Sequence, residues 1–459
     1  MTNVRRLTVI LLCLAGCSCL SAQNAGDVQQ TDSLPAQWDL QTCIEYALQQ
    51  NITIRKNRLN AESATVDVKT AKAALFPSLS ANVSQRIVNR PNSDVNTIID
   101  GDNITSSSSK TSYNGSYGID ANWTLYNGGK RLNTLKQQRL NNRIAELNVA
   151  ESENSIEESI AQIYVQILYA SEAVKINEAT LEVSQAECAR AKELFAAGSI
   201  AKSDLAQLEA QVSTDKYQLV TAEATLQDYK LQLKQLLELD GEEDMNLYIP
   251  ALGDESVLLP LPAKNDVYRA ALLLRPEIEA SKLDVEAADL DIKIARAGYI
   301  PTLSLSAGIG TTNSNGNDFT FGEQIKQNWN NSLGFTVSIP IFSNRQNKSA
   351  VEKAKIQKLT SELSLLDEQK ALYKTIESLW LDANSAQQQY EAAVEKLKST
   401  QTSYELIQEQ FNLGMKNTVE LLTEKNNLLN AQQETLQAKY MAILNMQLLK
   451  FYQGDDLKL

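Results

Sequence analysis

The stretch SYNGSYGIDANWTLY, residues 112–126, alternates strictly between two kinds of residue. Its odd-numbered positions, from Tyr113 to Leu125, are apolar or glycine, and its even-numbered positions, from Asn114 to Thr124, are polar or glycine. A period of two places successive side chains on opposite faces of a β-strand. The stretch therefore predicts a strand with one apolar face and one polar face, in a chain that elsewhere has the pattern of long helices.

Three further segments show the same alternation, over 79–87, 303–310 and 329–341. Together the four segments predict two β-hairpins, 78–126 and 302–342, each with a long polar tip. Strands of about 10 residues with aromatic side chains toward their ends have the length and composition of transmembrane β-strands.

The polar faces of these strands are small and almost uncharged, which is unusual for a sheet face that meets bulk water. A soluble sandwich with its apolar faces inside is the alternative, but the chain offers no second sheet to cover the first. Lipid outside and a water-filled lumen inside fits better. Because a single-chain barrel needs about 8 strands and open edges are not tolerated in lipid, the chain is expected to oligomerise.

Two segments, 130–196 and 345–412, contain neither proline nor glycine. As helices at 1.5 Å per residue, each would reach roughly 100 Å. Both carry a narrow apolar seam with steps of three and four residues, which suits packing side by side with neighbouring helices. The seam residues are Ile156, Ile160, Ile163, Ile167, Ala170 and Val174 in the first segment, and Leu359, Leu363, Leu366, Tyr373 and Trp380 in the second.

Each long helix is followed by a matched glycine, Gly198 in LFAAGSIAKSDL and Gly414 in QFNLGMKNTVEL. Glycine accepts the left-handed conformation that closes a helix, so a tight helix–turn–helix is expected at both places. Ser203 or Asp204 in the first copy, and Asn417 or Thr418 in the second, can cap the returning helix. The sequence thus predicts long antiparallel helical hairpins with sharp tips.

The mature chain is a tandem duplication. When the sequence is aligned with itself at an offset of 224 residues, FPSLSANVS aligns with IPTLSLSAG. Further along the chain, the offset becomes 216 residues. We expect a first structural repeat over 36–239 and a second over 265–451, each in the order helix, hairpin, long helix, turn, helix. The acidic, proline-containing segment 240–264 links them, and 452–459 forms a C-terminal tail.

Residues 1–22 read as an export signal, with Arg5 and Arg6 before a short apolar run. The sequence Leu14-Ala15-Gly16-Cys17 resembles a bacterial lipobox, which would place a lipid on Cys17 after cleavage. Ordinary signal cleavage near Ala22 is the alternative. Beyond the signal only Cys43 and Cys188 remain, too few and too far apart for a disulfide framework.

Composition argues against several functions. The chain carries 43 basic and 56 acidic residues and a net charge of −13, which argues against a nucleic-acid partner. It contains no histidine, the commonest general base and metal ligand. The segment NGGKR, 127–131, lacks the Walker A pattern, and IIDGDN, 98–103, lacks the EF-hand pattern. We therefore expect no catalytic residue, metal site or cofactor, and no enzyme.

The chain resembles the TolC family of outer-membrane efflux proteins over nearly its whole mature length. The duplication, FPSLS and IPTLS before the hairpins, NWTLYNGGKR and SIPIFSNRQ after them, and the two F-x-x-G turns carry the resemblance. It implies a homotrimer in the outer membrane of a Gram-negative bacterium, in which a 12-stranded β-barrel continues into a periplasmic α-barrel. It also implies a periplasmic adaptor protein and an inner-membrane RND or ABC pump as partners, and outer-membrane lipid around the strands.

The same resemblance implies a gate at the periplasmic tip. Matching around Gly414 puts Glu420 at the first of two acidic positions that line the constriction. Thr423 occupies the second position and departs from the family's aspartate. The alternative is that Glu420 and Lys416 form an ordinary exposed i, i+4 ion pair.

The resemblance also implies that a link between the two helical hairpins holds this gate closed. The resemblance puts Lys416 at the basic linking position, with Ser203 and Asp204 in the partner region. Phe411 stands where the family has a tyrosine, so this link would lack a hydroxyl group. The tip turns at Gly198 and Gly414 would dock the adaptor.

The function that follows is a passive exit duct for small molecules, drugs among them, with energy supplied by the partner pump. A type I protein secretion duct of the same family is one alternative. A lipid-anchored, structural coiled-coil surface protein is an alternative from a different class. The sequence does not identify the cargo, the pump or the adaptor.

Overall fold

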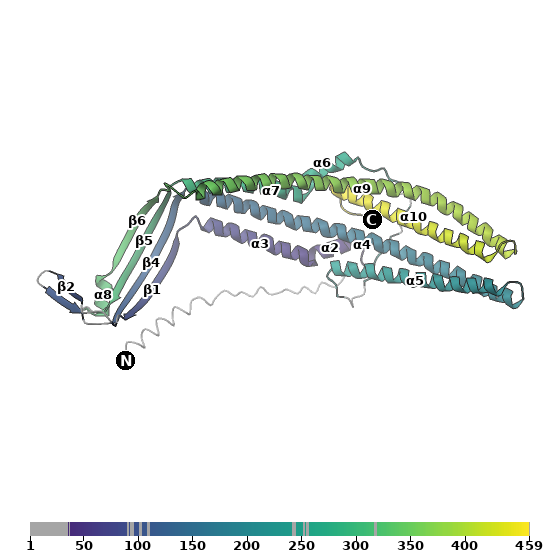
Figure 1. Ribbon diagram of the computed structural model, residues 1–459, viewed down its shortest axis with the longest axis horizontal. Coiled ribbons are helices and arrows are strands. Elements are labelled where there is room, and N and C mark those ends of the chain that lie inside the picture. The colour runs from purple at the N-terminus through teal and green to yellow at the C-terminus, as the bar shows by residue number, and fades with distance from the viewer. Residues whose placement is uncertain are drawn as a thin grey trace.

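The computed structural model describes residue 35 and residues 37–458, apart from 90, 92–95, 101–102, 108–110, 241–244, 251–252, 254–256 and 316–318. The expected signal segment 1–22 and Cys17 lie outside the described residues. The molecule is elongated, with a small sheet at one end and long helices that reach away from it to two tips (Figure 1). This mainly helical fold with one four-stranded antiparallel sheet confirms the predicted fold class.

The sheet has the order β1-β4-β5-β6, and every neighbouring pair is antiparallel. Its register sets Ala121 opposite Ala307, and Ala307 opposite Leu333, so the apolar sets of both repeats fall on one face. Pairing of β4 with β5 joins the two repeats in one sheet. The strands are β1 (Ser78–Asn89), β4 (Thr111–Asn127), β5 (Thr302–Ser314) and β6 (Asn330–Ser338).

The hairpin tips, predicted as polar loops, contain secondary structure. Strands β2 (Asn96–Asp100) and β3 (Asn103–Ser107) pair within the first tip. A short helix, α8 (Phe321–Gln327), forms in the second, where Thr320 and Glu323 make a capping box. The last strand is also shorter than expected: β6 ends at Ser338, before a proline at 340 that could not donate to the ladder.

Two helical hairpins form the rest of the molecule. Both rods begin after a residue in the left-handed conformation, Gly129 (φ +79°) and Arg345 (φ +65°), and each contains 67 residues. Each rod is packed along its distal half against its returning helix (Figure 1). The first hairpin consists of α4 (Lys130–Ala196) and α5 (Lys202–Leu236), and the second of α9 (Gln346–Asn412) and α10 (Thr418–Gln453).

Shorter helices pack alongside the rods. A side-chain cap at Asn51 separates two of them, and the step from Arg275 to Pro276 separates another two. These elements are α2 (Leu40–Gln50), α3 (Ile52–Ala73), α6 (Lys264–Leu274), α7 (Pro276–Arg296) and the 3-10 turn η2 (Ala297–Tyr299).

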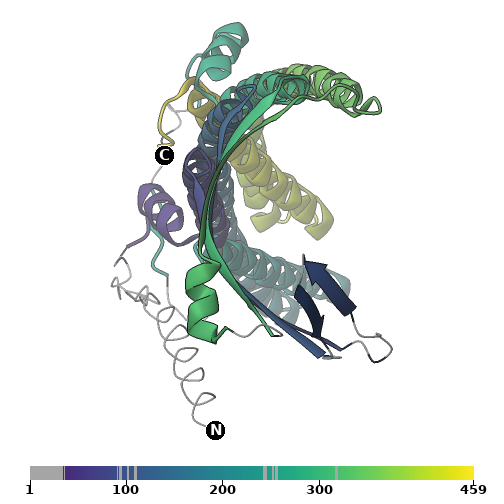
Figure 2. The same cartoon turned by 90° about the vertical axis from the view of Figure 1, so that its left-hand side faces the viewer.

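The helices near the sheet form a wall in the same order as the strands. Helices α3 and α7 precede β1 and β5, and helices α4 and α9 follow β4 and β6. Since α3 packs on α4, α4 on α7, and α7 on α9, the sequence of neighbours is the same in both layers. Viewed from the sheet end, sheet and helices follow one curved arc (Figure 2). The molecule is therefore a single curved wall four elements wide.

The main hydrophobic core lies near the middle of the rods. There the N-terminal segment, α2, α4, α5 and α10 meet around Trp38, Tyr164 and Leu237. A second cluster joins α6 and α7 to α9 and α10, including Val267, Ile278 and Ile376. None of the helices in the described part of the chain has the length and apolarity of a membrane span.

Candidate functional site

The apolar face of the sheet is open. Leu79, Val83, Leu333 and Phe335 are 65–75% exposed, although side chains of this kind are usually buried. Exposed aromatic residues lie toward both ends of this face: Trp123 and Tyr126 near the helices, and Tyr113 and Trp329 near the hairpin tips. An apolar band of this kind, with aromatic residues at both borders, is typical of a strand surface that faces lipid.

The opposite face is polar and nearly uncharged. Among the described residues of the four strands, Arg86 and Asp120 are the charged side chains of this face. The Asn82 amide donates a hydrogen bond to Asp120 Oδ2 at 3.0 Å. Two residues before Asp120, Gly118 of β4 lies opposite Gly310 of β5. This face is suited to line a wet passage.

The sheet is incomplete at both sides. Within the described sheet, β1 and β6 each have a strand neighbour on one side only. Their outer backbone groups therefore have no ladder partner within this sheet, a condition that membrane-spanning sheets do not tolerate. Both edges are therefore free to pair with further strands.

The helical wall has an open apolar seam as well. On the half of α9 nearer the sheet, a seam with steps of three and four residues stays exposed, whereas Leu372 and Ile376 further along the same helix are buried. Leu59 and Val66 on α3, at the opposite side of the wall, are also exposed. The exposed seam residues of α9 are Ile356, Leu359, Leu363 and Leu366.

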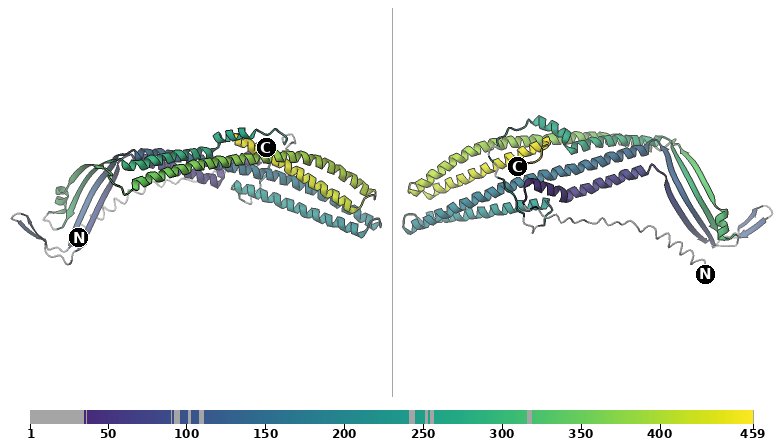
Figure 3. Two further views of the ribbon diagram at one scale, coloured as in Figure 1. Left: turned by 45° about the horizontal axis from the view of Figure 1, so that its top comes forward. Right: turned by 180° about the vertical axis from the view of Figure 1, so that it is seen from behind.

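At the far end, the two tips are built in the same way. Gly198 (φ +76°) and Gly414 (φ +75°) occupy the left-handed conformation. The next amide in each copy, of Ser199 and Met415, donates a hydrogen bond of 2.8 Å to the carbonyl five residues earlier. This is the Schellman arrangement, which satisfies carbonyl groups at the end of the helix. The two tips lie side by side in every view (Figure 3).

The residues assigned to the gate by resemblance lie around these tips. Lys416 Nζ lies 2.5 Å from Glu420 Oε1, and the Glu420 N–H bonds to the Asn417 side chain at 2.9 Å. The hydrogen bond from Lys416, followed by the one from the Asn417 backbone, lowers the pKa of Glu420. Glu420 is therefore fully ionised at neutral pH. Thr423 donates its hydroxyl to the Val419 carbonyl at 2.7 Å.

Within one chain, the structure does not join Lys416 to the first hairpin. Asp204 accepts a hydrogen bond from the Ala201 N–H at 3.4 Å and so serves its own helix start, next to the exposed Ser203. No ion pair between Lys416 and Asp204 occurs among the described residues. Phe411 lines a pocket between the hairpins.

A different set of residues joins the two hairpins, and sequence reading did not find it. Lys425 on α10 is 5% exposed and lies 3.2 Å from Asp215 on α5, which is 1% exposed. The Lys425 ammonium also donates to Ser184 Oγ, and Ser184 donates to Asp215. A second carboxylate, Glu187 on α4, lies 3.7 Å from the Lys425 ammonium.

The fourth helix contributes a tyrosine to this cluster. Tyr404 on α9 donates its hydroxyl to Glu187 at 3.1 Å, and burial raises the pKa of Tyr404 so that it remains a donor. The cluster of Lys425, Asp215, Ser184, Glu187 and Tyr404, which we name the tip junction, thus contains a residue from each of α4, α5, α9 and α10. Nearer the tip, Arg190 donates to Asn412 at 2.5 Å and adds a second link between the hairpins.

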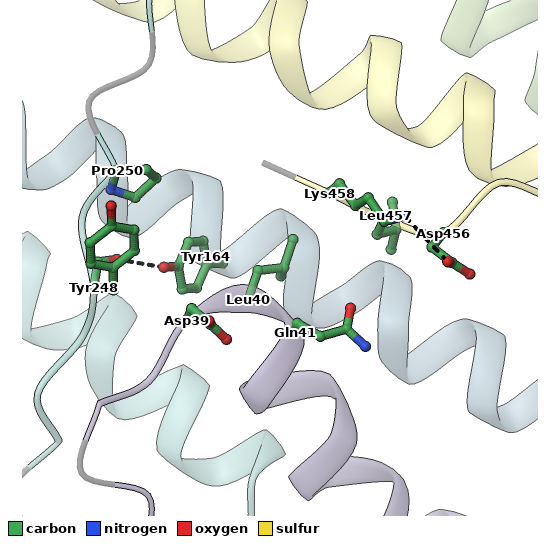
Figure 4. A pocket seen from close by; sticks show the side chains of 9 residues that line it. All are labelled: Asp39, Leu40, Gln41, Tyr164, Tyr248, Pro250, Asp456, Leu457 and Lys458. Carbon is green, nitrogen blue, oxygen red and sulfur yellow. Dashed lines mark hydrogen bonds and ion pairs between the residues drawn. The ribbon is translucent and has the colours of Figure 1, made fainter.

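A pocket in the middle of the molecule lies between the N-terminal segment, the loop at 245–250 and the C-terminal tail (Figure 4). The Tyr164 hydroxyl donates to the Tyr248 carbonyl at 2.5 Å, and Asp39 caps α2 beside it by accepting from the Thr42 N–H at 2.7 Å. The first contact fastens the loop to α4, and the second stabilises the start of α2. In the part of the chain that the structure describes, no group of acidic or cysteine side chains is placed to hold a metal ion.

Comparison with known proteins agrees with this architecture. The model of the family described as outer membrane efflux protein matches residues 43–238 and 267–454. The chain belongs to the outer membrane efflux protein family.

Individual relatives cover most of the chain. It is 23% identical over 423 residues to the outer membrane protein TolC of Escherichia coli (strain K12), covering 90% of this chain and 81% of that one. It is 23% identical over 404 residues to a probable outer membrane lipoprotein, SilC, of Salmonella typhimurium, covering 87% and 82%. A crystal structure of CusC superposes with a TM-score of 0.77 at 20% identity, covering 90% and 91%.

Proposed function

We propose that this protein is the outer-membrane channel of a tripartite efflux system and serves as a passive exit duct from the periplasm to the exterior. The strands lie in the outer membrane of a Gram-negative bacterium, and the rods extend through the periplasm. The energy comes from an inner-membrane pump, and a periplasmic adaptor connects that pump to the tips. The proposal is supported by family membership and by the exposed faces of the single chain.

One observation carries the proposal. The sheet exposes an apolar face on one side and a nearly uncharged polar face on the other, and both of its edges are open. Water would have to solvate the apolar face at a cost of about 25 cal/mol for each Å². Lipid removes this cost, but only if the edges are paired.

Further copies of the same chain can pair the edges. In a homotrimer, β1 of one copy would lie beside β6 of the next, which gives a closed set of twelve strands. The exposed seam of α9 would meet the exposed side of α3 in the neighbouring copy, and the helical walls would enclose a periplasmic tunnel. A closed oligomer of this kind satisfies the open edges and covers the apolar seams in one step.

The tips would form the periplasmic gate. Glu420 from each copy would supply a ring of carboxylates near the constriction, which favours cations. Lys416, Asp204, Ser203, Thr423 and Phe411 would surround it, and the turns at Gly198 and Gly414 would meet the adaptor. Lipidation of Cys17 would add an anchor at the N-terminus.

The test starts from membranes of cells that produce the full-length protein. We expect it to resist extraction with salt and alkali, to dissolve in detergent, and to run as an oligomer in SDS without heating. In planar bilayers the purified protein should give discrete single-channel currents. A protein that alkali releases in soluble form, or a detergent-soluble oligomer without conductance, would contradict the duct and favour the lipid-anchored coiled-coil protein.

A further inference from the structure

The short helix α8 lies on the apolar face of the sheet. The Phe321 ring meets the Tyr117 ring edge to face, with 6.2 Å between centroids. The Thr311 hydroxyl donates to the Ile325 carbonyl at 2.8 Å, and the buried Gln324 accepts from the Ser314 N–H at 2.8 Å. Figure 2 shows α8 on the convex side of the curved sheet. The helix is therefore fixed on the side that we assign to lipid.

The position of α8 along the sheet is also defined. It is attached to β5 at Thr311, nine residues beyond the start of the strand at Thr302. At about 3.3 Å per residue this is roughly 30 Å along the strand. With the strand tilt of about 40° usual for outer-membrane barrels, the height is roughly 23 Å, close to the ~25 Å of the apolar band. The helix thus lies at the outer border of that band.

The side chains around α8 are amphipathic. Phe319, Phe321 and Trp329 are 50–55% exposed, although all three are large and aromatic. Lys326 and Glu323 are exposed on the same short helix. Aromatic rings together with charged groups are typical of segments at the boundary between acyl chains and headgroups.

We propose that residues 319–329 form an interfacial anchor that inserts Phe319, Phe321 and Trp329 into the acyl–headgroup boundary of the outer leaflet. The partner is a lipid surface, because the anchor continues the apolar face of the sheet beyond the last pair of β5 with β6, Gly310 opposite Asn330. The inference rests on the proposed function, which places that face in lipid. The anchor fixes the depth at which the channel lies in the membrane.

Site-directed spin labelling tests this directly. Cys43 and Cys188 are buried and are replaced by alanine, as is Cys19, which would remain after cleavage before Cys17. Single cysteines are then introduced as Phe319→Cys or Phe321→Cys in the full chain reconstituted into phospholipid vesicles. Leu333→Cys on the apolar face and Ser332→Cys on the polar face serve as controls. Collision of the label with oxygen reports lipid, and collision with a water-soluble nickel chelate reports water.

We expect labels at 319 and 321 to collide more with oxygen than with the nickel chelate, less strongly than the label at 333, and the label at 332 to show the reverse. Nickel access at 319 and 321 equal to that at 332, with lipid still reported at 333, overturns the anchor and leaves the duct intact. Spin–spin broadening at both sites would show that another copy covers them, and also overturns it. Nickel access at 333 itself would refute the membrane placement of the sheet.

Discussion

Lys425 is a buried, charged side chain that joins the two helical hairpins near their tips. An ammonium group loses its hydration when it is buried, and here Asp215, Ser184 and Glu187 replace that hydration. The partners come from helices more than 200 residues away in sequence, so no local pattern around Lys425 indicates its role. The tip junction adds charged contacts between the two hairpins to the apolar packing of Leu422 on α10 against Cys188 and Leu208.

Lys425→Ala should destabilise the distal half of both hairpins. It leaves Asp215 and Glu187 buried without a cation, a change that costs about 3–5 kcal/mol for buried pairs. Amide hydrogen exchange of the detergent-solubilised protein should show faster exchange in α10 near the tip. The double variant Lys425→Met with Asp215→Leu should recover part of the protection, because Glu187 keeps its hydrogen bond from Tyr404 but still lacks a cation.

Lys396→Ala is the matched control, because Lys396 forms an exposed ion pair with Glu434 between α9 and α10, 2.7 Å long. Exposed pairs contribute little to stability. If Lys396→Ala and Lys425→Ala change exchange equally, the tip junction has no special role.

The gate assignment concerns Glu420 and Lys416. If their carboxylate and ammonium groups restrict the pore, Glu420→Ala or Lys416→Ala should enlarge the single-channel conductance in planar bilayers. Glu420→Ala should in addition weaken cation selectivity, because it removes a ring of negative charge. An unchanged conductance in the double variant would remove both residues from the gate and leave the exposed i, i+4 pair as their description.

At the scale of elements, helix α4 carries two partly buried carboxyl groups, Glu157 and Glu158. Burial raises the pKa of Glu158, against the opposing effects of Arg275 and of a hydrogen bond from the Tyr452 hydroxyl at 3.4 Å. Burial raises the pKa of Glu157 as well. Both carboxyls therefore favour the protonated form in the folded protein more than in the unfolded chain.

The sign of the pH dependence follows from this. A group whose pKa is raised on folding contributes stability that is fully present below its unfolded pKa, about 4.5, and that is lost as the pH rises through the folded pKa. Glu158→Gln keeps an acceptor for Tyr452 and removes the charge. It should raise the melting temperature at neutral pH and change it little near pH 4.5.

Circular dichroism melting between these two pH values checks this prediction. Glu182→Gln, an exposed carboxylate on the same helix, is the control and should leave the pH dependence of melting unchanged. A Glu158→Gln variant with the pH dependence of the unmodified protein would show that this carboxyl does not respond to burial.

The elements differ in how far they can be predicted. The rods are predictable because uninterrupted helical sequence between Gly129 and Gly198 leaves few alternatives, and the strands because their alternation is strict. Helix α8 is not, since seven residues are too few to show a period, and only the Thr320–Glu323 capping box indicates it. The predicted end of the last strand lies beyond the observed end of β6, because the alternation continues through Ile339 and Ile341, past the proline at 340.

At the scale of the whole molecule, the proposed channel is shared between copies, and a single sequence does not show how their faces meet. The open edges of β1 and β6 and the exposed seam of α9 predict a closed oligomer. Native mass spectrometry in detergent should give three times the mass of one mature chain. Particles of two or four chains would contradict the trimer, and a stable monomer would contradict closure altogether.

Rods α4 and α9 have the same number of residues and begin at the same end of the wall, so both tips finish at one level. A deletion in one hairpin would leave its tip short of the plane that the other defines. A deletion whose length is not a whole number of heptads would also rotate the apolar seam away from the neighbouring helix. The reach of such a protein across the space between two membranes can thus change only in matched steps, about 10 Å per heptad in both halves at once. A change in the distance to be spanned would therefore require the same change of length in both repeats.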